Sequence, residues 1–376
     1  MLWLRFFMMV SLSAALRSEA PASAGSPAYV QKKLSIQENP CDITERAGNP
    51  CVAAHSTVRA LYASFDGPLY EVTRSSDGRS TDVGVLVHGG FANATTQDAF
   101  CAASACVISK VYDQSPMGND LGQRHKLVDA AKHRIAVGPA QLPVYGMWFD
   151  PGYGYHVDDT AGMATGNEPE SIYAVMSGTR HQAGGGGCCF DYGNSENSVV
   201  AKNQSDGAGA MEAIYFGNAH WMGNSGDNAT VDGPWVGADL EAGMYYGGGN
   251  ETKVNTRNKP LPFPFVTLYL RGAEDGFALK GGDATRGALA TMYDGPRPDC
   301  AIAGTCDRHR NATYTPSYQP MHKQGAIILA TGGDDSNDAL GNFYEGFIVA
   351  GATTDETDDA VQDNIVAVGY RTAAGA

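Results

Sequence analysis

Short runs of β-branched, aromatic and aliphatic residues recur along this chain, separated by glycine, asparagine and aspartate. Such runs bounded by turn residues are typical of short strands. The clearest examples are residues 171–176, 211–216, 265–270, 326–330 and 343–350. Many short strands with glycine-rich turns predict an all-β sandwich or barrel.

Helical spacing is scarce. It predicts one helix over residues 52–63 and another over 358–370, with Asp355, Thr357 and Asp358 as candidate N-terminal caps. We find no repeat of fixed period and no linker that divides the chain. We therefore expect one catalytic-sized β domain over residues 25–376.

The N-terminus resembles a secretory signal. Arg5 precedes an apolar stretch over residues 6–16, and Ala22, Ser23 and Ala24 form a small-residue cleavage site. The apolar stretch is too short to span a bilayer. We therefore predict a signal peptide over residues 1–24 and a secreted, extracellular protein. The candidate glycosylation sites in Asn-x-Ser/Thr triplets are Asn93, Asn203, Asn228, Asn250 and Asn311.

The eight cysteines fall into four local pairs, which is typical of an oxidising compartment, and none has zinc-site spacing. Cys188 and Cys189 are adjacent and follow a run of four glycines. A bond between them would close a strained eight-membered ring, and strain of that kind gathers at functional sites. The alternative is that each pairs elsewhere or stays free.

Composition excludes several partners. The net charge of −15 argues against nucleic acid and against anionic membranes. Few charged residues, 47 glycines and 18 tyrosines suit a rigid extracellular protein that meets neutral polymers such as polysaccharides. We expect a monomer.

Metal and cofactor chemistry is not expected, because the nine histidines are scattered without HExxH or paired ligand spacing. GxSxG is absent as well. His55 is expected on a helix surface or at a cap. No Lys-Ser/Thr follows the glycine run at 184–187, which argues against a phosphate loop.

Carboxylates are the remaining candidates for catalysis. Asp239 and Glu241 are two residues apart, so on a strand they would share a face at roughly 6.5–7 Å. Two acids on a buried face perturb each other's pKa; an exposed strand with two solvated acids is the alternative. Asp334 follows an apolar run and a Gly-Gly turn, which would hold it at the rim of the core. A plain acidic turn explains that segment equally well.

Longer motifs then add a resemblance to a known family. They cover nearly the whole mature chain, in order, and resemble the α-L-arabinofuranosidases of glycoside hydrolase family 54. The motifs are PCDI at 40–43, PCVAAHST at 50–57, RALY at 59–62, VYDQS at 111–115, EPE at 168–170, CCFDYGN at 188–194, MEAIY at 211–215, GPW at 233–235, GGDDSN at 332–337 and FYEG at 343–346.

This resemblance implies a concanavalin-like β-sandwich with few short helices and a retaining mechanism. It assigns the nucleophile to Glu241 and the general acid/base to Asp334, with Asp239 binding a sugar hydroxyl. Two carboxyl groups roughly 5–5.5 Å apart are what a retaining glycosidase needs.

The resemblance also assigns the sugar pocket. It matches Cys188 and Cys189 to a vicinal disulfide that packs against the arabinofuranose, Trp221 to an aromatic wall and Gly333 to a main-chain contact. Spacing and resemblance together suggest the pairs Cys41–Cys51, Cys101–Cys106 and Cys188–Cys189. Cys300–Cys306 rests on spacing alone.

The chain departs from the family pattern in three places. Ala242 and Gly243 stand where family members usually have amides, so hydroxyl contacts are lost. The segment 222–232 is longer than usual, which weakens the Trp221 match. Family members commonly carry a C-terminal arabinose-binding β-trefoil, for which there is no room before Ala376. We therefore expect weak binding to insoluble polymer, or a fragment.

The leading hypothesis is an exo-acting α-L-arabinofuranosidase that releases terminal arabinose from arabinoxylan or arabinan of the plant cell wall. One alternative is a non-catalytic sugar-binding sandwich, although two opposed acids argue against it. The other is a related exo-glycosidase acting on β-xylosides or β-galactofuranosides.

Overall fold

The computed structural model describes residues 38–182, 188–197, 210–218, 233–240, 244–247, 255–298 and 320–373. Within these residues the chain is mostly β, with helices α2 (Pro40–Arg46), α3 (Ala94–Phe100) and α4 (Asp355–Val368). No helix in those ranges combines the length and apolar character needed to cross a membrane.

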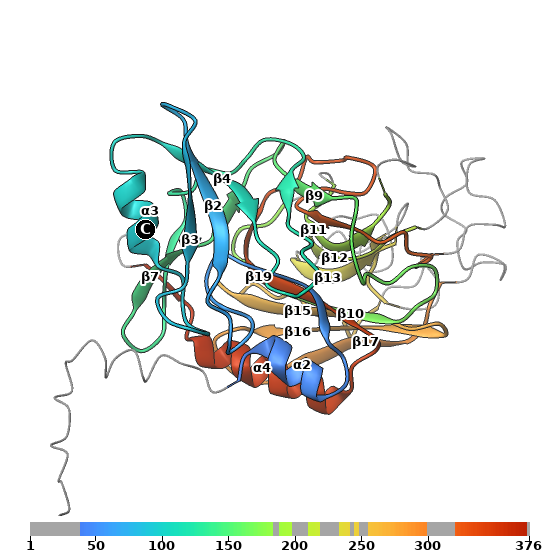
Figure 1. Cartoon of the computed structure of the whole chain (residues 1–376). Helices are drawn as coiled ribbons and strands as arrows, with labels where there is room; N and C mark the ends of the chain where they lie inside the picture. Colours follow the sequence, from blue (N-terminus) through green and yellow to red (C-terminus); the bar gives the residue numbers. More distant parts are fainter. Residues whose placement is uncertain are drawn as a thin grey trace, which may run out of the picture.

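Two antiparallel sheets of seven strands each pack face to face (Figure 1). The first sheet runs in the order β1 (Cys51–Ser56), β19 (Gly341–Ala350), β10 (Glu170–Met176), β15 (Val266–Gly272), β16 (Gly276–Asp283) and β17 (Ala290–Pro296), and β8 (Met147–Phe149) pairs with β19. The second runs in the order β14 (Met244–Tyr245), β13 (Trp235–Asp239), β12 (Glu212–Gly217), β11 (Asp191–Ser195), β18 (Ala326–Leu329), β9 (Tyr155–Val157) and β5 (Gly122–Gln123). The predicted β-sandwich is confirmed.

Two smaller sheets flank the sandwich. One contains β3 (Ser80–Gly84), β2 (Pro68–Arg74) and β4 (Cys106–Val111); the other contains β20 (Arg371–Thr372), β6 (Arg134–Val137) and β7 (Leu142–Tyr145). Helices α2 and α4 lie side by side below the first sheet in Figure 1. Tyr173 of β10 and Lys280 of β16 both donate hydrogen bonds to the buried Asp358 carboxylate of α4. These bonds tie α4 to the outer face of the first sheet.

Side chains alternate across the second sheet, and this alternation decides where a site can lie. Tyr192, Ile214 and Ala238 are fully buried and belong to the main core between the sheets. Successive strand residues point to opposite faces. Their neighbours Asp191 and Asp239 therefore belong to the outer face, which the first sheet does not cover.

All five strands predicted from the sequence are present as β10, β12, β15, β18 and β19, with ends shifted by one or two residues. The helix predicted over residues 52–63 is wrong. Residues 51–56 form β1 and pair with β19, from Cys51 opposite Val349 to Ser56 opposite Glu345. All six residues of β1 are buried. Burial on every side suits a covered strand rather than the single buried stripe of a helix.

The C-terminal helix is confirmed, but its cap lies one residue before the first candidate. The Thr354 hydroxyl accepts a hydrogen bond from the Thr357 N–H at 3.3 Å, and Gly369 ends α4 with φ 66°. Asp355 and Asp358 lie inside the first turn. Negative charge there is stabilised by the partial positive charge of the helix N-terminus.

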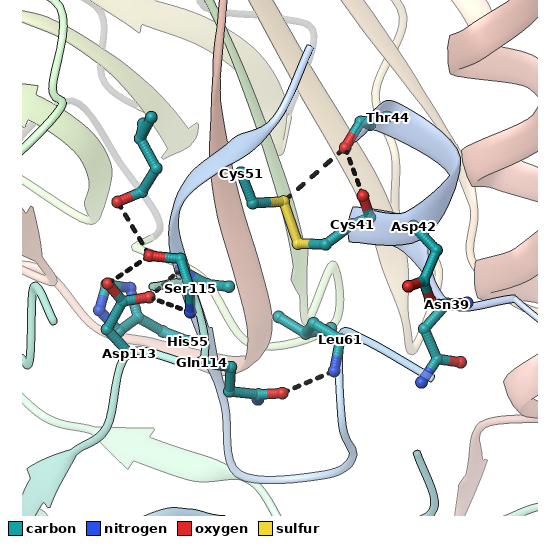
Figure 2. Close-up of a disulfide and its surroundings, with 12 residues drawn as sticks. Asn39, Cys41, Asp42, Thr44, Cys51, His55, Leu61, Asp113, Gln114 and Ser115 are labelled. Carbon is teal, nitrogen blue, oxygen red and sulfur yellow. Dashed lines mark hydrogen bonds between the residues drawn. A yellow bond between two sulfur atoms is a disulfide. The ribbon is translucent and has the colours of Figure 1, made fainter. Parts of the chain in front are cut away.

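The local disulfides predicted in the N-terminal part are present. Cys41 of α2 bonds to Cys51 of β1, and the Thr44 hydroxyl lies 3.8 Å from the Cys51 sulfur (Figure 2). Cys101 bonds to Cys106. Cys300 and Cys306 lie outside the described residues, so that pair stays a prediction.

His55 is not on a helix surface, as expected from the sequence, but buried on β1 close to Asp113 (Figure 2). Its Nε2 lies 2.8 Å from the carbonyl oxygen of Asn119, so Nε2 carries the proton. Its Nδ1 then accepts from the Tyr192 hydroxyl at 3.0 Å. Burial lowers the pKa of His55, which makes it a neutral structural residue.

Candidate active site

The cysteine pair lies immediately before β11, and Cys188 and Cys189 are bonded to each other as predicted. Cys189 is buried and Cys188 is partly buried. The pair packs on the outer face of the second sheet against one small group of buried residues: Tyr215, Trp235, Met244 and Tyr246.

The disulfide packs against aromatic rings that also contact one another. The Tyr246 ring centre lies 5.8 Å from that of Trp235 and 6.3 Å from that of Tyr215, both edge to face. Side chains of this size, fully buried and interlocked, hold few alternative rotamers. The disulfide is therefore fixed on a rigid aromatic base.

Asp239 ends β13 beside the disulfide. One carboxylate oxygen of Asp239 and the two cysteine sulfurs all lie within 4.8 Å of one another. Sulfurs that are bonded to each other are not thiolates, so this group is not a metal site. Asp239 is 5% exposed. It is an almost buried acid at the edge of a sulfur surface.

The turn that carries Asp334 lies next to the disulfide. This turn, residues 332–336, begins three residues after β18 ends, as expected for a buried strand that leads to the rim of the core. The Gly332 N–H donates to the Ser336 carbonyl at 2.8 Å, and the Ser336 N–H donates to Asp334 Oδ1 at 2.9 Å. The Asp334 side chain is exposed.

Two contacts join this turn to the disulfide. The Ser336 hydroxyl donates to the Cys189 sulfur at 3.7 Å, and the Asp338 N–H donates to the Cys188 carbonyl at 2.8 Å. A Cβ on Gly332 would lie 3.4 Å from the Cys189 sulfur. The turn therefore touches the disulfide directly.

Gly333 is required by close packing. A Cβ at this position would run into the carboxylate of Glu196 and lie 2.7 Å from the hydroxyl of Ser195. Both of these residues are fully buried. Only glycine lets the backbone come this close, which leaves its main chain next to Asp334 without a covering side chain.

One acid in this region was missed in the sequence. Asp191 is fully buried at the start of β11, and burial, then the negative charge of Asp239, hold the pKa of its carboxyl well above the usual range. The charges of Asp334 and Glu196 act in the same direction. Two features of the sequence could have pointed to Asp191. It lies two residues after Cys189, and it precedes Tyr192, a residue of the core.

The structure thus brings together Cys188, Cys189, Asp239, Gly333 and Asp334 on one face. Glu241, two residues beyond β13, and Trp221 lie outside the described residues. So do Asn203, Asn228, Asn250 and Asn311, whereas Asn93 is partly buried just before α3.

A separate pocket of about 360 Å³ does not contain these residues. It is lined by His133, Trp148, Ser177, Thr179, Arg180, Pro264, Phe265, Asn342, Tyr344 and Thr372. Its polar groups mostly bond to each other, as Arg180 does to Asn342 Oδ1 at 3.1 Å. Burial, then the Arg180 charge, lowers the pKa of His133 to about 4. The polar groups that line this pocket are therefore largely occupied by one another, and the pocket does not correspond to the predicted site.

With this geometry in place, comparison with known proteins identifies the family. Residues 40–371 match the family model described as Alpha-L-arabinofuranosidase B, catalytic. The chain belongs to this family. It is 42% identical to an alpha-L-arabinofuranosidase B of Emericella nidulans over 349 residues, which cover 90% of this chain and 63% of the relative. An Aspergillus niger alpha-L-arabinofuranosidase B is also 42% identical, with 89% of this chain and 64% of the relative covered.

Solved structures agree with the arabinofuranosidase B family. A mutant of a family 54 α-L-arabinofuranosidase soaked with 4-nitrophenyl α-L-arabinofuranoside matches with a TM-score of 0.79 and 40% identity, covering 89% of this chain and 66% of that one. An arabinofuranosidase complexed with arabinofuranosyl-α-1,2-xylobiose matches with a TM-score of 0.78, 40% identity and the same coverage. The chain spans about 63% of the length of the curated relatives.

Proposed function

We propose that this chain is a secreted, retaining exo-α-L-arabinofuranosidase that removes terminal α-L-arabinofuranosyl residues from arabinoxylan or arabinan. The observation that carries the proposal is the meeting of a vicinal disulfide, a nearly buried aspartate and an exposed aspartate turn on one sheet face. Membership of the arabinofuranosidase B family and the relative complexed with arabinofuranosyl-α-1,2-xylobiose support the proposed substrate class.

In the proposed mechanism, Glu241 attacks the anomeric carbon while the bond to the leaving oxygen breaks. Asp334 gives its proton to that oxygen, so the departing sugar leaves as a neutral alcohol. Asp334 then takes a proton from water, which attacks the same carbon and releases Glu241. Two inversions give net retention of configuration.

The local structure supports the role of Asp334. A general acid must reach a substrate that enters from solvent, and this carboxyl is exposed at the end of a buried strand. The Ser336 N–H fixes one of its oxygens.

The disulfide supports the binding of a small ring. A furanose offers few hydroxyls, so a rigid apolar surface can hold it with little loss of entropy. Cys188 and Cys189 provide that surface above Trp235 and Tyr246, and the carboxylate of Asp239 lies at its edge for a sugar hydroxyl.

Secretion, the signal peptide over residues 1–24 and glycosylation at the five triplets belong to this proposal. The described disulfides support it, because such bonds persist in oxidising compartments.

A panel of 4-nitrophenyl glycosides tests the proposal. We expect hydrolysis of the α-L-arabinofuranoside, with β-xyloside and β-galactofuranoside far behind, and loss of turnover in Glu241→Gln. Glu356→Gln, on the exposed face of α4, is the matched control and should keep wild-type rates. Turnover of no glycoside would favour a sugar-binding sandwich, and preference for another glycoside would favour a different exo-glycosidase.

A further inference from the structure

The residue after Asp334 has an unusual backbone conformation. Asp335 lies in the left-handed region, with φ 67°. Residues other than glycine adopt that region infrequently, and aspartate is among those that tolerate it. The Asp335 N–H donates to the Gly332 carbonyl at 3.2 Å, which closes the turn around Asp334. The left-handed conformation of Asp335 is therefore part of the turn that carries Asp334.

One side chain holds Asp335 there from a distant part of the sequence. Arg124, which follows β5, donates from Nε to Asp335 Oδ1 at 2.7 Å and from Nη2 to Oδ2 at 2.6 Å. Two parallel bonds fix both the position and the plane of the carboxylate. The Arg124 backbone N–H is itself bonded to the Gly154 carbonyl at 3.2 Å, so the fork projects from an anchored segment.

Further contacts restrain the same turn. His125 Nε2 lies 3.8 Å from Asp335 Oδ1 and 3.3 Å from the Thr331 hydroxyl. The Gly152 N–H donates to the Asn337 carbonyl at 2.7 Å. The segment that follows β5 and the segment that precedes β9 thus both hold the turn, which also contacts the disulfide through Ser336.

We propose that Arg124 is a positioning residue: its paired bonds to Asp335 hold the turn so that the Asp334 carboxyl faces the leaving oxygen. This inference rests on the proposed function of Asp334. The alternative is an ordinary surface ion pair, whose loss would leave catalysis unchanged. Arg124 and Asp335 differ from such a pair because their side chains are only 27% and 29% exposed. Loss of the fork should weaken proton donation while the sugar-binding surface stays in place.

Proton donation has a specific kinetic signature, because a good leaving group needs little protonation. The test measures kcat/KM for aryl α-L-arabinofuranosides whose phenols span a wide range of acidity. Arg124→Ala should lose roughly tenfold or more on the least acidic phenol and less than about threefold on the most acidic. Asp334→Asn should show the same trend more steeply. Arg124→Lys keeps the charge without the fork and should resemble Arg124→Ala.

Two further variants separate the ion pair from the backbone. Asp335→Gly keeps the freedom for positive φ but loses the pair, and should resemble Arg124→Ala. The Arg124→Ala/Asp335→Gly double variant should be no worse than the stronger single variant, because both changes remove the same interaction. The matched control is Arg74→Ala. Arg74 is the last residue of β2 and makes a similar fork to Asp77 in the turn that follows, with Nε 3.1 Å from Oδ1. Its loss should leave the trend unchanged.

The possible results distinguish the positioning role of Arg124 from the general-acid role of Asp334. Equal losses on all phenols, or no loss, in folded Arg124→Ala would overturn the positioning role while Asp334→Asn still shows its trend. If Asp334→Asn itself shows no trend, the assignment of the general acid fails. Should Arg124→Ala not fold, Arg124→Lys and Asp335→Gly give the same comparison.

Discussion

The hydroxyl of Ser336 donates a hydrogen bond to the sulfur of Cys189 across 3.7 Å, and it comes from a turn 147 residues away in sequence. The same serine holds Asp334 through its backbone N–H. One residue therefore connects the proposed sugar-binding surface to the proposed general acid. Displacing either part is expected to disturb the other.

The vicinal disulfide should matter more for kinetics than for stability. Replacing Cys188 and Cys189 together by alanine should lower kcat/KM by about tenfold or more, a loss of about 1.4 kcal/mol in transition-state binding. The stability loss should be modest, because a two-residue ring constrains the unfolded chain little. Steady-state kinetics and thermal unfolding measure the two effects.

The Cys101–Cys106 bond provides the control, because it lies between α3 and β4, away from the site. Its double-alanine variant should lose stability with unchanged kinetics. A folded Cys188→Ala/Cys189→Ala variant with wild-type kcat/KM would remove the disulfide from the proposed site.

The buried Asp191 should make stability depend on pH. Its folded-state pKa lies above the unfolded value of about 3.9, so its contribution is complete at low pH and is lost as pH rises through the folded value. Asp191→Asn cannot ionise. Its free energy of unfolding should therefore fall less than that of the wild type between about pH 5 and pH 8.

Denaturant unfolding at several pH values measures this difference. Asp359→Asn, which removes an exposed acid of α4, should follow the wild-type curve. Parallel curves for Asp191→Asn and the wild type would mean that Asp191 titrates normally in the folded state.

A buried ion pair between the sheets should be costly to break. Lys323 Nζ donates to Glu212 Oε2 at 2.7 Å, and the two side chains are 1% and 0% exposed. Lys323→Met would leave the Glu212 carboxylate buried without its cation, which costs about 3–5 kcal/mol. Denaturant unfolding should show that loss, and Glu212→Gln in the same chain should recover part of it. A loss below about 1 kcal/mol would contradict the buried pairing.

The sequence was enough to predict those parts of the fold that depend on local pattern. Residues 326–330 read as a buried strand because they are continuously apolar, and the glycines after them marked the turn of Asp334. The failure at residues 52–63 has the opposite cause. That segment becomes a strand by pairing with β19, about 290 residues away, and local spacing carries no record of such a partner.

The candidate site shows the same division. The adjacent cysteines and the aspartate turn were visible as motifs, and the family resemblance ranked them above other acids. The pairing of Arg124 with Asp335 joins residues 211 positions apart, so only the fold reveals it. Asp191 was present in a quoted motif, but its importance comes from burial beside Asp239, which no spacing rule expresses.

The most direct test of the proposed activity is the product that Glu241→Ala forms from an aryl α-L-arabinofuranoside in the presence of azide. The variant alone should lose activity by several orders of magnitude, because the glycosyl-enzyme bond cannot form. Azide can occupy the space of the missing carboxylate and attack the anomeric carbon once. We predict partial rescue and an arabinofuranosyl azide of inverted configuration by NMR. No rescue, an azide of retained configuration, or near wild-type turnover in Glu241→Gln would contradict the proposed mechanism.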